Sequence, residues 1–134
     1  RRIVGDYILT GNDIRTAQRQ DDVVVLGAWR IDQHPDDAAG YHDQPIVPPY
    51  DISYRTLLPQ GVENLWVAGR CHSATSEALA SSRVTANSMG MGQAAGTAAA
   101  MATVMNVGSR GVPMTDLQDR LIAADVILDP ASAM

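Results

Sequence analysis

The residues best placed to do chemistry are an arginine and the long small-residue segment that follows it. Arg83, Val84 and Thr85 lie where a proline-free stretch rich in Ala, Gly, Ser and Met continues to residue 105. This stretch predicts a long helix that starts near residues 84–86. The first N–H groups of a helix lack intrahelical partners and carry partial positive charge. The sequence therefore predicts a site for an electron-rich oxygen, although a surface arginine before a core helix has the same pattern.

A short apolar run that stops at a glycine is the second candidate. Residues 65–68 are typical of a buried strand, which ends at Gly69 and Arg70. Ligands of open α/β sheets bind at the carboxyl ends of strands, and glycine lets a ligand approach the backbone. Ala68, Gly69 and Arg70 are therefore candidate binding residues. A strand-to-loop turn without a ligand would have the same sequence.

The glycines of residues 90–96 are similar to a dinucleotide-binding pattern. That fingerprint must follow a strand directly, whereas here it lies inside the expected helix. Gly92, Gly96 and Ala100 recur at every fourth residue, share one face, and instead predict close helix packing. An NAD-binding enzyme that uses residues 90–96 stays an alternative, and it requires a strand directly before Gly90.

The polar loop at residues 33–49 and the cysteine segment give weaker patterns. Imidazoles and carboxylates that could bind a divalent metal occur in the loop at His34, Asp36, Asp37, His42 and Asp43. Solvated loops collect such residues without a metal, so no metal site is predicted, and His34 alone is kept as a candidate proton carrier on the substrate side. No recognised nucleophile motif surrounds Cys71, His72 and Ser73.

Composition excludes several classes of protein. The 134 residues carry a formal net charge of −5 and no run of Lys or Arg, which argues against a nucleic-acid surface. One cysteine permits no intramolecular disulfide and no zinc site built on several thiolates. Polar residues such as Asn87 and Gln93 interrupt the Ala/Gly stretch, so we expect a helix buried in a globular protein and no membrane span.

The elements that must position these residues follow from periodicity and turn residues. Strands are predicted at 3–9, at 23–26 with an extension toward 31, at 52–57 and at 65–68, with a turn at 59–61. Thr10 begins a turn with a possible helix cap, and residues 14–20 form a short polar helix or an irregular segment. A final helix capped by Thr115 or Asp116 runs to residue 124. One face of it contains Leu117, Leu121 and Ile122.

These separate signals become specific through their order along the chain. The order is Gly5, Asp6 and Tyr7; Gly27, Trp29, Ile31 and His34; Pro49, Tyr50 and Asp51; Asn64, Leu65, Val67, Ala68, Gly69 and Arg70; Ser82, Arg83 and Val84; and Gly92, Gln93, Gly96 and Thr97. This series resembles the C-terminal portion of the bacterial FAD-dependent oxidoreductase family, which is related to the glutathione reductase and succinate dehydrogenase flavoproteins. The resemblance extends from residue 1 to about residue 128, and residues 64–70 and 83–100 are its most specific parts.

The resemblance implies roles for the candidate residues. The run ending at Ala68 and Gly69 looks like the strand whose end meets the ribityl and pyrophosphate region of FAD. Many related flavoproteins have an acidic residue next, which holds a ribityl hydroxyl, whereas here Arg70 occupies that position. The helix after Arg83 looks like the one whose N-terminus faces the flavin pyrimidine edge, with N–H groups from Val84 and Thr85.

The resemblance also implies an α/β fold class, an α+β fragment in this chain. Residues 1–62 would form part of a β-rich substrate-side region, and residues 63–134 would complete a Rossmann-like FAD-binding domain with one long Ala/Gly-rich helix. The N-terminal GxGxxG half is missing, so we expect a fragment of a longer protein that binds FAD weakly or not at all on its own. Its partners would be that N-terminal portion and a small substrate.

The implied reaction is hydride transfer between a small organic substrate and FAD. On the substrate side, His34 would move a proton and Arg55 would hold a carboxylate. The alternative is a non-catalytic module that forms homo-oligomers through its Gly/Ala helix.

Overall fold

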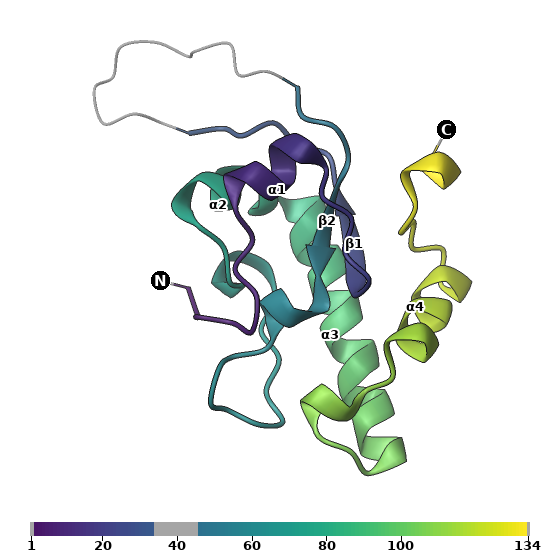
Figure 1. The fold of residues 1–134 in the computed structure, drawn as a ribbon. Coiled ribbons are helices and arrows are strands. Elements are labelled where there is room, and N and C mark those ends of the chain that lie inside the picture. The colour runs from purple at the N-terminus through teal and green to yellow at the C-terminus, as the bar shows by residue number, and fades with distance from the viewer. Residues whose placement is uncertain (1, 34–45, 134) are drawn as a thin grey trace.

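The computed structural model describes residues 2–33 and 46–133. Figure 1 shows a small sheet packed against one long helix, with the other helices around them. The elements are α1 (Gly11–Thr16), β1 (Val23–Gly27), β2 (Tyr50–Ser53), α2 (Ser76–Ser82), α3 (Thr85–Met105) and α4 (Met114–Ala123), with the 3-10 turns η1 (Tyr54–Leu57), η2 (Gly69–Cys71), η3 (Ser109–Gly111) and η4 (Pro130–Ala133). This mixture of helix and strand agrees with an α+β class.

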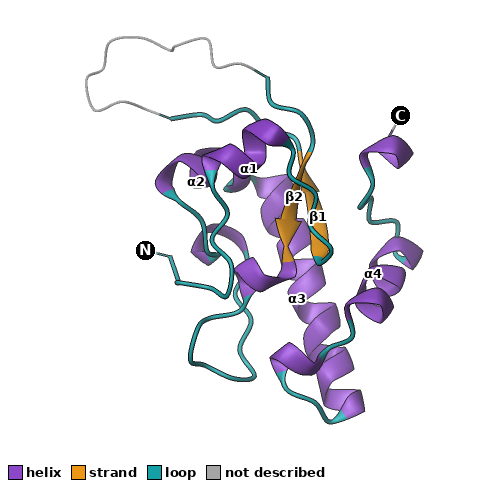
Figure 2. Cartoon of the chain, in the orientation of Figure 1, coloured by secondary structure: helices purple, strands orange, loops and turns teal. Residues whose placement is uncertain are grey.

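The sheet of the described residues has two antiparallel strands. β1 pairs with β2, with Val25 opposite Ile52 and Gly27 opposite Tyr50. Most of β1 and all of β2 is buried, as the apolar run in β1 predicts. β1 was expected to extend toward residue 31, but it ends at Gly27, and Figure 2 shows how small a part of the chain is strand.

Helix α3 is the predicted long helix, and it begins where the sequence indicates. Its buried face packs against β1, η2 and α4 and presents Met91, Ala94, Ala98, Met101 and Ala102 to the core. Gly90 lies against β1, since a Cβ there would be 3.1 Å from a methyl of Val25. Small side chains let the helix approach the strand closely, and dispersion contacts then favour this packing.

The opposite face of α3 is open within the described residues. A Cβ at Gly92 or at Gly96 would have no atom within 4 Å, and Val104 is 87% exposed. The close packing expected on this face is therefore not found in the part of the chain that the structure describes.

Three expected strands are wrong in whole or in part. Residues 3–9 make single bridges, Gly5 to Pro59 and Leu9 to Ala74, because this segment passes several neighbours in turn. Residues 65–68 form no strand. Residues 52–57 split into the end of β2 and η1, because the Asp22 carboxylate accepts the amide N–H of Arg55 and turns the chain.

The helix predictions differ from the structure mainly at their ends. Thr10 caps α1 in a reciprocal pair with Asp13, which confirms the cap, but the helix spans Gly11–Thr16. Helix α2 was not predicted, although Thr75 caps it. Helix α4 begins at Met114 after Pro113, before the expected caps. Leu117 and Leu121 are buried as expected, whereas Ile122 is 56% exposed.

Two methionines of α3 provide a matched test of this packing. Met91 is fully buried and Met89 is 70% exposed. Met91→Ala should lower the free energy of unfolding by about 2–5 kcal/mol through lost burial and a cavity. Met89→Ala should change it by less than about 0.5 kcal/mol. Urea denaturation measures both, and equal losses would contradict the assigned faces of α3.

Candidate functional site

A pocket of about 240 Å³ lies at the N-terminus of α3. Its lining comes from three separate segments of the chain, and the residues are Trp29, Asp32, Arg70, Ala80, Arg83, Val84 and Thr85. The structure therefore brings together four of the six residues that the sequence indicated for cofactor binding. Ala68 and Gly69 directly precede Arg70 but do not line the pocket. Cofactor binding by these six residues stays a prediction.

The N-terminus of α3 has no side-chain cap. Val84 is the N-cap residue and makes no side-chain cap hydrogen bond. Thr85 is exposed at the first helical position. Among the described residues no side chain accepts from the N–H groups of this first turn, and these groups add to the positive end of the helix dipole. This end of the pocket favours an electron-rich or anionic group.

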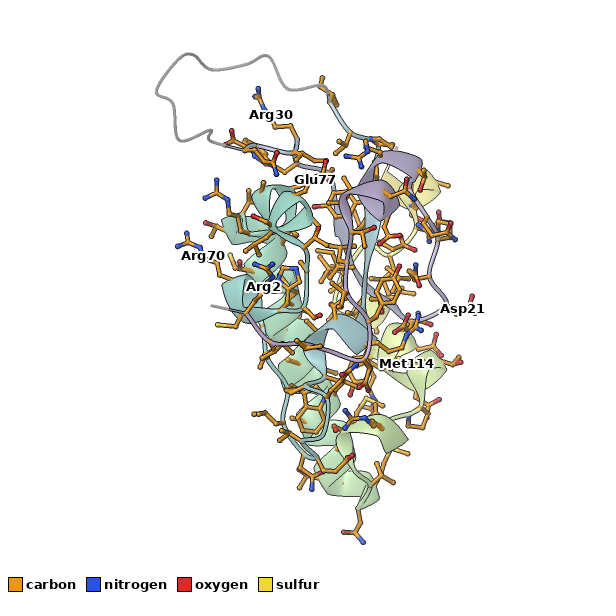
Figure 3. The ribbon with its side chains drawn as sticks, turned by 60° about the vertical axis from the view of Figure 1, so that its left-hand side comes forward. Arg2, Asp21, Arg30, Arg70, Glu77 and Met114 are labelled. Carbon is orange, nitrogen blue, oxygen red and sulfur yellow. The ribbon has the colours of Figure 1, made fainter. Side chains whose placement is uncertain are left out.

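The η2 turn brings Arg70 to the start of α3. Gly69 has φ +67°, a left-handed conformation that glycine adopts without strain. A Cβ added to Gly69 would lie 3.5 Å from the Cβ of Ser88, in the first turns of α3. Figure 3 shows the Arg70 side chain projecting from the ribbon on the opposite side from Met114.

The last turn of α2 positions Trp29 and Asp32, which also line the pocket. Ser81 Oγ donates a hydrogen bond to the Trp29 carbonyl and lies 2.7 Å from the Tyr50 hydroxyl. The Asp32 N–H donates to the Ala80 carbonyl over 3.4 Å. Arg83 follows directly and donates from Nη2 to the Asp32 carbonyl, also at 3.4 Å. The pocket therefore combines two arginines with one aspartate and a half-exposed indole.

His72 follows the η2 turn and is fully buried. Its Nδ1 lies 2.7 Å from the Gly69 carbonyl and its Nε2 lies 3.0 Å from Ser82 Oγ. A carbonyl only accepts, so Nδ1 carries the proton. Burial lowers the pKa of His72 below its ordinary value of 6.5, and the hydrogen bond to Gly69 opposes this without cancelling it.

The two substrate-side candidates do not lie in this pocket. His34, like the other acidic and histidine residues of its loop, lies outside the described residues. Arg55 lines a separate cavity of about 330 Å³ with Asp22 and Arg110. Its guanidinium pairs with both Asp22 oxygens, at 2.9 and 3.0 Å, and lies 5.2 Å from the ring centroid of Tyr7. The Arg55 guanidinium therefore already has a carboxylate partner. Its role in binding a substrate carboxylate stays a prediction.

Sequence reasoning missed Trp29 and Asp32 as pocket residues. The segment at 29–32 was expected to continue a strand, and its only signal was a tryptophan between Ala28 and Arg30. The glycine pattern at 90–96 lies inside α3 and follows no strand, so the requirement of the NAD-binding alternative is not met. In the described ranges, no helix has the length and apolar character to span a membrane, and no three metal-ligating side chains gather.

The pocket thus places two arginines beside the positive end of a helix, an arrangement that favours a group with electron-rich oxygens. The profile of the family described as FAD dependent oxidoreductase matches residues 1–121, and the chain therefore belongs to that family. Membership identifies FAD as the cofactor and oxidoreduction as the class of chemistry. Comparisons with curated proteins and with solved structures gave no match.

The buried imidazole predicts a dependence of stability on pH. The folded-state pKa of His72 lies below the unfolded value, so the stability from the neutral imidazole is complete above pH about 6.5 and is lost as the pH falls through the folded pKa. We expect the urea midpoint to decrease between about pH 7 and pH 5. His72→Gln, which does not titrate, should remove most of that decrease, and an undiminished decrease in this variant would contradict the assignment.

Proposed function

We propose that this chain is the C-terminal part of a flavoenzyme. In this proposal residues 63–134 complete a Rossmann-like FAD-binding domain, and residues 1–62 form part of the substrate-side region. The N-terminal portion of the same protein supplies the half that binds the ADP moiety. The observation that carries the proposal is the pocket that joins Arg70 to Arg83, Val84 and Thr85 at the uncapped start of α3.

The residues of the pocket fit the pyrimidine edge of a flavin. FAD, when bound, supplies the hydride chemistry with a small organic substrate. The N–H groups after Val84 would donate hydrogen bonds to the oxygen and nitrogen atoms of that edge. Arg83 would add a full positive charge where negative charge develops as the flavin is reduced, a form of electrostatic stabilisation by fixed groups. Trp29, which also lines the pocket, would contact the bound group through its indole.

Arg70 gives this site a feature of its own. It stands where many related flavoproteins have an acidic residue, and it lines the pocket. Its guanidinium would attract anionic groups of the cofactor, whereas a carboxylate would accept a hydrogen bond from a hydroxyl. On the substrate side, His34 and Arg55 remain the proposed residues, and Arg55 would have to exchange its contact with Asp22 for a substrate carboxylate.

A titration of the isotope-labelled chain with FAD, followed by NMR, tests this proposal. We expect a dissociation constant on the order of 1 mM, since the ADP half has no site in this chain. The amide signals of residues 69–71 and 84–86 should shift most. Arg83→Gln should weaken binding by about three- to tenfold through loss of one charge-assisted hydrogen bond.

Two controls make this result specific. Arg120→Gln removes the same charge from an exposed position on α4 and should leave binding unchanged. ADP carries the phosphates of FAD without the flavin ring, and it should shift the amides of residues 84–86 much less. Equal shifts with ADP, or no shift with FAD at millimolar concentration, would refute a flavin site here.

The open face of α3 favours the second candidate function, an oligomerisation module. Gly92 and Gly96 lie on this face with no neighbouring atoms in the described chain, and small residues let two helices approach closely. If this module is the function, light scattering should show a dimer that Gly92→Leu abolishes while FAD binding is unchanged. A monomer at about 0.1 mM would exclude a dimer of micromolar affinity.

A further inference from the structure

A single imidazole connects the two segments that supply the arginines of the pocket. His72 Nδ1 donates to the Gly69 carbonyl, at 2.7 Å, and Gly69 directly precedes Arg70. His72 Nε2 lies 3.0 Å from Ser82 Oγ, and Ser82 directly precedes Arg83. Each arginine is therefore one residue away from a group that His72 holds.

The backbone at both contacts has short-range hydrogen bonds of its own, since the His72 N–H donates to the Gly69 carbonyl at 3.1 Å and the Arg83 N–H donates to the Leu79 carbonyl at 3.1 Å. The η2 turn has only three residues, and its N-cap Ala68 makes no side-chain cap hydrogen bond. The end of α2 at Arg83 leads directly into the uncapped N-cap of α3. The buried imidazole adds a link between these two segments and restricts their separation, because a ring nitrogen that loses its partner in the interior costs free energy.

The electrical state of the imidazole also matters for the pocket. Two arginines and the positive end of α3 already lie at the pocket. With Nδ1 protonated, the ring is neutral and its Nε2 accepts a hydrogen bond from the Ser82 hydroxyl. The ring therefore adds no third full charge to the pocket. Ser82 Oγ has a second acceptor within reach, the Ala78 carbonyl at 3.0 Å, so its single proton is shared between two directions.

We propose that His72 is a positioning residue of this site, whose imidazole bridges Gly69 and Ser82 and thereby sets the spacing of Arg70 and Arg83 around the pocket. This inference rests on the proposed flavin site for its functional meaning. It assigns His72 no contact with the cofactor and no part in hydride transfer.

Variants that keep one contact each separate the two halves of the bridge. An asparagine amide at this position occupies the place of Nδ1, so His72→Asn keeps the bond to Gly69 and loses the one to Ser82. A glutamine amide reaches the place of Nε2, so His72→Gln keeps the bond to Ser82 and loses the one to Gly69. Ser82→Ala leaves the imidazole intact and removes only its second partner, and it serves if either His72 variant fails to fold.

The first measurement needs no flavin. Long-range nitrogen NMR of the chain should show His72 protonated at Nδ1 and unprotonated at Nε2. His72→Gln should then shift the amide of Arg70 more than that of Arg83, and Ser82→Ala should shift that of Arg83 more. Unchanged Arg70 and Arg83 amides in folded variants would overturn the positioning role, whatever FAD does.

The second measurement is a double-mutant cycle on the dissociation constant for FAD, in the NMR titration described above. His72→Gln should weaken FAD binding by about fivefold, the effect of one net hydrogen bond. In an Arg70→Gln background the same substitution should weaken it by less than about twofold, since the arginine it positions is absent. His72→Asn should recover most of the affinity for FAD.

The outcomes distinguish this inference from the proposed function. If Arg70→Gln and Arg83→Gln leave FAD binding unchanged, the flavin site itself is refuted. If both arginine variants weaken binding but the effect of His72→Gln is the same with and without Arg70, His72 has only a general structural role and the positioning role is refuted. Non-additive effects, together with the recovery by His72→Asn, support it.

Discussion

The described chain has a ladder of only two strands, so side chains must satisfy many of its buried polar groups. Asp22 accepts hydrogen bonds from the Ser53 hydroxyl, the Arg55 amide and the Arg55 guanidinium, and thereby ends β2. Arg110 plays the same part for the loops around residue 60, since it donates to the Asp6 and Glu63 carboxylates and to the Pro59 carbonyl. Side-chain hydrogen bonds of this kind fix the irregular segments, which have no strand neighbour to pair with in the described chain.

The pKa values of two buried carboxylates, Asp22 and Asp51, are shifted in opposite directions. Burial acts to raise the pKa of Asp22, but the hydrogen bonds from Arg55 and Ser53 outweigh it and the pKa is lowered. Burial raises the pKa of Asp51, and the Gln20 amide and Arg19 oppose this only in part. Arg19 also donates to the Leu128 carbonyl, so the Asp51 contact ties the segment after α4 to the sheet. The last turn of α2 works similarly around the pocket, where residues 80–82 hold Asp32, Trp29 and His72.

The sequence was most informative where a pattern is local. The long helix from Thr85, the strand at Val23 and the Thr10 cap follow from composition, an apolar run and one hydrogen bond across three residues. The strands expected at 3–9 and 65–68 have suitable residues, but strand formation requires a neighbouring strand, and the described chain provides none there. Propensity alone contains no information about that partner.

The candidate site was predictable to a similar extent. Arg70 and Arg83 were indicated by their positions next to a glycine and a helix start, and the structure places both in one pocket. Trp29, Asp32 and the bridge by His72 depend on contacts between residues 10 to 52 positions apart, which no spacing rule describes. For Arg55 the sequence showed a charge, whereas the structure shows the carboxylate that it pairs with.

The two tryptophans of the chain lie in contrasting surroundings. Trp29 lines the pocket and is 46% exposed, whereas Trp66 is partly buried and donates a hydrogen bond to the Tyr54 hydroxyl. Indole emission depends on the polarity around the ring, so the two residues should emit at different wavelengths. The chain thus contains two intrinsic optical reporters. One responds to what enters the pocket, and the other responds to the integrity of the interior.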